Sequence, residues 1–247
     1  MFELIYKLPF FTRVGRGKSV HNPTVLTLST KVPRIKSGTS HYGRGDDGYS
    51  EFVEGLRLPK HSPAHQIYGE VERTKWALSK VLYLNKQVPF LEPFDAYQLE
   101  WFCENLHSLG SYCFSWGKDT STNHIYPVEV LSTIEKRIKY IQNIEIDNKI
   151  IGHCQDFLSF DDERLLELDF ARMCFRKLES NYFLWYTTIY GLVPIEGTKK
   201  DTLALLNRAS IYIWWVMRHT SRILKIQEIY WAAKVTPYNP PSFEIEE

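Results

Sequence analysis

Five long segments, separated by residues that break helices, make up the chain from Pro63 to about residue 226. Proline has a fixed φ and no amide hydrogen, so it is tolerated in the first turn of a helix and disfavoured in its interior. Pro63, Pro93 and Pro127 stand where such first turns would begin. Acidic residues 161–163 favour a further helix N-terminus, with Ser159 or Asp161 as its N-cap. The pattern predicts helices over residues 63–85, 93–115, 127–143, 161–190 and 200–226.

Helices joined by short or moderate connections predict an all-α fold, here a five-helix up-and-down bundle. We divide the chain into an extended basic N-terminal arm (1–40), the helical bundle (41–230) and an irregular acidic C-terminal tail (231–247). The arm shows no sustained helical or strand period. Pro237, Pro240 and Pro241 prevent a helix from continuing into the tail.

Composition narrows the class of protein. A chain of 247 residues with 44% hydrophobic residues is long and apolar enough to bury a sizeable core. Its longest apolar run, near Ile211–Met217, is far shorter than the roughly 18 residues that a membrane span needs, so we expect no span. The four cysteines are scattered without metal-site or disulfide spacing, which indicates a reducing compartment.

Charge is distributed unevenly along the chain. Residues 1–44 hold eight Lys or Arg and one acid, a net charge of +7, whereas the remaining 22 basic and 28 acidic residues give −6. A basic arm on an acidic body indicates a partner for the arm, either RNA phosphates or neighbouring proteins. The acid-poor arm also has the composition of a mitochondrial targeting segment, so we expect the mitochondrial matrix, or otherwise the cytoplasm.

A set of charged residues occupies one face of the predicted fourth helix. Arg172, Arg176 and Glu179 recur at positions i, i+4 and i+7, with Lys177 beside them, and Asn207 follows on the next helix. Fixed positive charge next to a carboxylate suits a polyphosphate with its metal ion. The alternative is a salt-bridged face exposed to solvent.

Several blocks of sequence, in a fixed order, carry a family resemblance. They are Arg44-Gly45-Asp46-Asp47-Gly48, residues 55–60, residues 68–72, the helix from Arg172 to Glu179, and residues 207–211. In this order the blocks resemble the PduO-type ATP:cob(I)alamin adenosyltransferases, and the resemblance covers roughly residues 41–225. It implies a five-helix bundle that assembles as a homotrimer, with ATP bound between subunits.

The resemblance also implies roles for individual residues. The ATP-binding set is Arg44, Gly45, Asp46, Gly48, Lys60, Arg176, Lys177 and Asn207. Glu179 lies near Mg²⁺ if ATP binds. Arg172 pairs with Glu72 across a subunit boundary, and Phe157 takes the place of the aromatic that displaces the lower ligand of cobalt.

Departures from the family pattern are concentrated where the reaction takes place. In the first helix an acid becomes Arg73 and an amide becomes Lys75, and an aspartate of the last helix becomes Ile211. The Pro-Gly-Gly of the corrinoid loop is missing near residues 156–161, and the lysine of the first phosphate loop has no clear equivalent. The nucleotide half of the site is partly kept and the corrinoid half mostly lost, which argues against cobalamin binding.

Two functions from different classes follow. The first is a catalytically degenerate adenosyltransferase fold that serves as a structural subunit of a large mitochondrial assembly, a ribosome or a respiratory complex. The second is an active enzyme that transfers the 5′-deoxyadenosyl group of ATP to cob(I)alamin. An ATP-binding regulatory subunit without transfer chemistry is a third reading.

Overall fold

A computed structural model describes residues 46–51, 57–114, 127–147, 158–191, 195 and 197–230. This part of the chain contains five helices: α1 (Pro63–Gln87), α2 (Pro93–Phe114), α3 (Pro127–Asp147), α4 (Glu163–Tyr190) and α5 (Gly197–Ile223). The predicted all-α helical bundle is confirmed. The arm (1–40), the tail (231–247) and three predicted site residues, Arg44, Gly45 and Phe157, lie outside the described residues.

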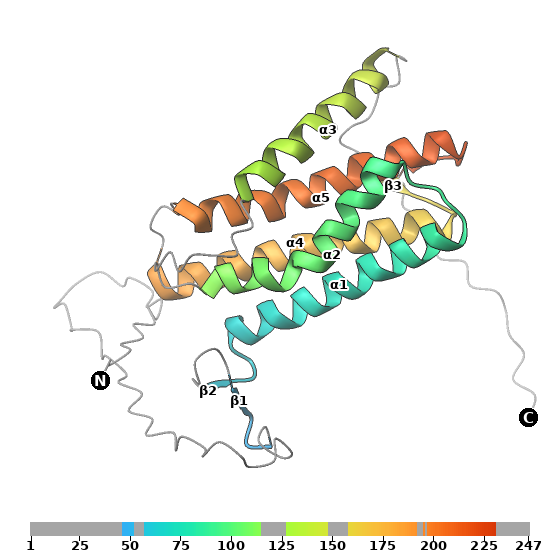
Figure 1. Cartoon of the computed structure of the whole chain (residues 1–247). Helices are drawn as coiled ribbons and strands as arrows, with labels where there is room; N and C mark the ends of the chain where they lie inside the picture. Colours follow the sequence, from blue (N-terminus) through green and yellow to red (C-terminus); the bar gives the residue numbers. More distant parts are fainter. Residues whose placement is uncertain are drawn as a thin grey trace, which may run out of the picture.

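Four of these helices form the body of the bundle. Figure 1 shows α1, α2, α4 and α5 running side by side, with α3 lying against α5 at an angle. Helix α4 packs against both α1 and α5, and α2 packs chiefly against α1. Fully buried apolar side chains fill the space between them, among them Ile67, Leu78, Leu99, Phe102, Phe175 and Ile213. Burying each such side chain contributes roughly 1.5–3 kcal/mol, so this interior is the main source of stability.

Helix N-termini follow local rules in the sequence. Ser62 caps α1 through a hydrogen bond from the amide of His65 (3.4 Å), and Pro63 occupies the first turn. Asp162 caps α4, accepting from the amides of Arg164 (3.0 Å) and Leu165 (3.4 Å). The prediction of Ser159 or Asp161 as this cap was therefore wrong, because the carboxylate of Asp162 is the one that reaches the free amides.

Several predicted helix ends were displaced, and two C-terminal ends were displaced by more than two residues. Helix α3 extends four residues beyond its predicted end at 143, and its last turn buries Glu145 completely against Arg218 and Arg222 of α5. Helix α5 ends at Ile223 rather than 226, because Lys225 takes a positive φ of 57° and turns the chain back. Both displacements depend on contacts or turns that helical periodicity does not contain.

Two short antiparallel pairs of strands accompany the helices and were not predicted. Strand β1 (Tyr49–Glu51) pairs with β2 (Arg57–Pro59) just before α1. Strand β3 (Leu158–Ser159) pairs with β4 (Ile229–Tyr230), so the chain after α5 meets the chain before α4. Within the described ranges, no helix is both long and apolar enough to span a lipid bilayer.

A buried ionic cluster joins three helices. Arg137 of α3 donates from Nε to Asp95 of α2 (3.0 Å) and also forms an ion pair with Glu92. Tyr212 of α5 donates its hydroxyl hydrogen to Asp95 (2.6 Å), and His219 lies 3.1 Å from Glu92. Burial lowers the pKa of Arg137, but the two carboxylates outweigh burial and raise it overall. Burial, followed by the charge of Asp95, raises the pKa of Tyr212 well above its usual value, so this hydroxyl stays protonated and donates.

Removing the central cation should destabilise the bundle strongly. Arg137→Ala leaves Asp95, which is 1% exposed, without its charge partner. Breaking a buried pair typically costs about 3–5 kcal/mol, and we expect a loss in that range in urea denaturation. Lys139→Ala, on the exposed side of the same helix, is the control and should change stability by less than about 0.5 kcal/mol. A loss below about 1 kcal/mol in Arg137→Ala would contradict the cluster's structural role.

The cap of α4 should make stability depend on pH. Arg164 and the helix amides hold the pKa of Asp162 below its ordinary value of 3.8, so its contribution is present above that pH and lost as pH falls through the lowered value. Asp162→Ala should cost about 1 kcal/mol at pH 7. Asp162→Asn keeps a capping oxygen and should lose only the part that depends on pH. Thermal unfolding between pH 2 and pH 7 measures this, and identical profiles for wild type and Asp162→Asn would exclude it.

Candidate functional site

Two residues predicted to face the nucleotide meet across the α4–α5 contact. Asn207 of α5 donates its side-chain amide to Oε1 of Glu179 on α4, at 3.0 Å. Both side chains are half-buried. The packing of the two helices thus brings together residues that are 28 positions apart in the sequence.

Arg176 and Lys177 stand one turn before Glu179 on α4. Both are exposed, and neither has an ion-pair partner among the described residues. Arg176 precedes Glu179 by three residues and therefore shares its helix face. This side of α4 offers uncompensated positive charge beside one carboxylate, an arrangement that suits an anionic ligand.

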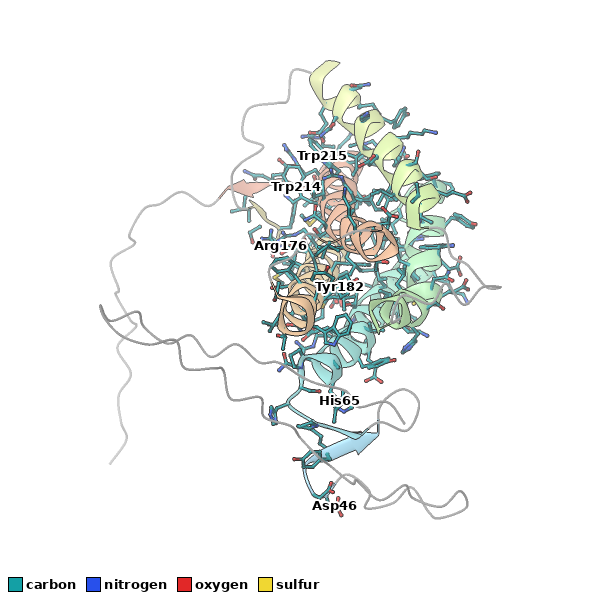
Figure 2. All side chains as sticks on the ribbon, turned by 90° about the vertical axis from the view of Figure 1, so that its left-hand side faces the viewer. Asp46, His65, Arg176, Tyr182, Trp214 and Trp215 are labelled. Carbon is teal, nitrogen blue, oxygen red and sulfur yellow. The ribbon has the colours of Figure 1, made fainter. Side chains whose placement is uncertain are left out.

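The predicted phosphate loop is a turn that precedes α1, beyond the N-terminal end of that helix (Figure 1). Gly48 has a φ of 81°, a conformation that glycine adopts without strain, and its carbonyl accepts from the amide of Lys60 (2.9 Å). Gly48 and Lys60 are thereby brought together where β1 and β2 meet. Asp46 lies at the tip of this turn, and Figure 2 shows it well apart from Arg176. Asp46 and Arg176 are thus apart within one chain, and an ATP site formed between subunits stays a prediction.

The predicted partners Glu72 and Arg172 do not meet within one chain. Arg172 donates instead to Asp169, one turn earlier on α4 (2.6 Å), while Glu72 is exposed on α1. Their pairing across a subunit boundary stays a prediction, and it would have to compete with Asp169.

Glu70 of α1 and Cys174 of α4 are both buried, and the sequence analysis assigned neither of them to the site. Glu70 is 8% exposed and lies 3.5 Å from Arg73, the arginine that replaces a family acid. Burial, followed by the charge of Glu70, raises the pKa of the Cys174 thiol to about 11, so the thiol is protonated and unreactive at neutral pH. The clue in the sequence was Glu70 itself, placed directly after Gly69 in a block that carries the family resemblance.

A shallow hollow of about 290 Å³ lies between α3 and α5, next to Asn207. An ion pair between Arg208 and Glu135 (2.9 Å) forms part of its wall. Its other lining residues are Leu131, Lys200, Leu203 and Ala204. Arg208 is neutralised by Glu135, so the hollow offers little positive charge beyond Lys200.

The described residues contain no cluster of three or more carboxylate, histidine or cysteine side chains that would hold a metal by itself. Glu179 alone supplies a carboxylate beside Arg176. Mg²⁺ accepts one carboxylate when phosphate oxygens and waters complete its shell, so these residues fit Mg²⁺ only together with a nucleotide. Ile211, where the family has an aspartate, packs against the hydrophobic core and adds no ligand.

Comparison with known proteins identifies the family and the fold. The sequence model described as "Cobalamin adenosyltransferase" matches residues 41–220. No curated protein is similar enough in sequence to be matched.

Solved structures of the same type share the fold. A phenylalanine-to-alanine variant of the PduO-type ATP:corrinoid adenosyltransferase from Lactobacillus reuteri, complexed with cobalamin and ATP, superposes with a TM-score of 0.59 at 15% identity, covering 77% of this chain and 98% of that one. An arginine-to-lysine variant of the enzyme from that organism, complexed with ATP, gives 0.58 at 16% identity, covering 78% and 100%. The match of the sequence model over most of the chain, together with these folds, shows that the chain belongs to the cobalamin adenosyltransferase family.

Proposed function

We propose that this chain is a catalytically degenerate member of its family that serves as a structural subunit of a large mitochondrial assembly, a ribosome or a respiratory complex. The observation that carries the proposal is the loss of two carboxylates where the family resemblance places the reaction. Arg73 stands where the family has an acid and is paired with Glu70, and Ile211 stands where it has an aspartate and packs on the core. A reaction that depends on positioned charge therefore lacks a carboxylate at both positions.

The corrinoid side fits its ligand poorly. The Pro-Gly-Gly loop is missing before Asp161, and Phe157 is the single aromatic that we assign there. The sequence therefore lacks the loop by which, as the family resemblance implies, the reactive reduced cobalt is shielded from water. We therefore derive no transfer step for this chain.

Exposed apolar side chains support a role in assembly. Trp76 and Tyr83 of α1 are 61% and 59% exposed, and Met173 of α4 is 48% exposed. Trp76 packs edge-on against Phe170, which links the two helices on this face. Tryptophan, tyrosine and methionine are enriched at interfaces between proteins. The face fits a protein neighbour, either another copy of the chain in a homotrimer or another subunit.

The basic arm supplies the second contact in this proposal. A net charge of +7 over residues 1–44 suits the phosphates of structural RNA, and an extended segment can also lie across protein neighbours. The acidic body is less suited to RNA, which leaves the arm as the part that would bind it.

Sedimentation of the endogenous protein from a gentle mitochondrial lysate tests the structural role. We expect the full-length chain to migrate with a megadalton particle, and a purified chain without residues 1–40, added to the same lysate, to migrate in lighter fractions. Both chains should show equal helical content by circular dichroism, which serves as the folding control. Migration of the full-length chain as a free trimer, or adenosylation of reduced cobalamin by the purified protein, would contradict the proposal.

The active-enzyme alternative draws support from Arg176, Lys177 and the Glu179–Asn207 pair, which still fit a polyphosphate with Mg²⁺. It predicts that calorimetry detects ATP–Mg binding, and that Arg176→Ala weakens it about tenfold or more through loss of a charge-assisted hydrogen bond. Because Arg176 is exposed, Arg176→Ala should change the free energy of unfolding of the protein by less than about 0.5 kcal/mol. Lys139→Ala on α3 removes an exposed positive charge elsewhere and should bind as wild type does. Wild-type protein that binds no ATP at millimolar concentration would exclude this alternative.

A further inference from the structure

A fully buried arginine lies near the end of α5. Arg218 is 0% exposed, and its guanidinium carbon lies 5.0 Å from the ring centre of Trp214 and 5.8 Å from that of Trp215. Figure 2 shows the two tryptophans adjacent to each other on this helix. An arginine cannot lose its charge in a protein, so burial at this position requires carboxylates nearby.

The main partner of Arg218 comes from beyond the helix. Glu228 accepts from Nε at 3.1 Å and from Nη2 at 3.3 Å, a two-point arrangement that fixes the position of its carboxylate. Glu145 of α3 is 3.8 Å away and adds a second negative charge. The family's sequence match ends at residue 220, so the two-point partner of a buried arginine lies outside the matched region.

A tight reversal brings Glu228 back to the helix. Lys225 has a φ of 57°, and the amide of Ile226 donates to the carbonyl of Ser221 at 2.7 Å, which closes the turn. The two residues after Glu228 are β4, and they pair with β3 in the register Ser159 with Ile229 and Leu158 with Tyr230. The ion pair and the strand pairing are thus adjacent in the sequence.

We propose that residues 224–230 form a C-terminal clasp that holds the segment leading into α4 against the bundle. Arg218 fixes Glu228, and Glu228 in turn fixes the strand that pairs with Leu158 and Ser159. Leu158 and Ser159 directly follow Phe157. The clasp therefore fixes the point at which the chain leaves the segment assigned to the corrinoid side. The clasp would hold this segment in the same way in an enzyme and in a structural subunit.

Packing of the segment itself is the competing explanation. Phe160 is 4% exposed and anchors the residue after β3 in the core without help from β4. Loss of β4 would expose the β3 amide that faces it under either explanation, because neighbouring amides of a strand point to opposite sides. If Phe160 alone held the segment, loss of the Glu228 charge would leave that amide as protected as before. The clasp requires the protection of β3 to depend on Glu228 as well as on β4.

Hydrogen–deuterium exchange of the full-length chain separates the two explanations. The double variant I229P/Y230P removes both backbone donors of β4 and keeps Glu228. We expect exchange in peptides covering residues 158–160 to accelerate about tenfold or more, while peptides from α1 remain unchanged as internal controls. Unchanged exchange at 158–160 would overturn the clasp.

Glu228→Gln tests the anchor separately, because it keeps β4 and removes the charge. We expect faster exchange at 158–160 in this variant. In the matched control Glu104→Gln, whose side chain is exposed on α2, we expect exchange at 158–160 to remain at the wild-type rate. Circular dichroism checks the helices in every variant. If the double-proline chain loses its helices, the Glu228→Gln comparison decides alone: acceleration with intact helices supports the clasp, and wild-type exchange refutes it.

Discussion

The packing of α4 between α1 and α5 is the contact on which the rest of the molecule depends. Through α1 it forms the core around residues such as Phe175, and through α5 it joins Glu179 to Asn207. The face of α4 that carries Arg176 is therefore fixed by the same packing that stabilises the bundle. A shift of α4 along either neighbour would separate Glu179 from Asn207 and disturb the core together.

Buried charge acts as a second constraint, along the C-terminal half of α5. Arg137 joins α3 to Asp95 of α2, and Arg218 joins α5 to carboxylates of α3 and of the C-terminal segment. Each cluster contains both signs of charge, so removing one member leaves the others uncompensated in a poorly solvated place. Such clusters specify where α3 and residues 224–230 lie against α5.

The candidate site combines preserved and altered parts. Arg176, Lys177 and Glu179 lie on α4 and Asn207 on the adjacent α5, where it bonds Glu179, whereas Arg73 and Ile211 stand where the family has carboxylates. Family membership fixes the fold, and these two substitutions are what direct our proposal away from transfer chemistry. The exposed aromatic side chains of α1 and α4 agree with our proposal that this face contacts a neighbouring protein subunit.

The sequence by itself determined the helices, because prolines, caps and apolar periodicity act within a few residues. It also placed Arg176 and Glu179 on one face and identified the family through ordered motifs. Only the tertiary structure decided that Asn207 reaches Glu179, that α3 runs on to bury Glu145, and that β4 returns to β3. These features depend on hydrogen bonds, ion pairs and strand pairing between residues far apart in the chain, for which local periodicity carries no signal.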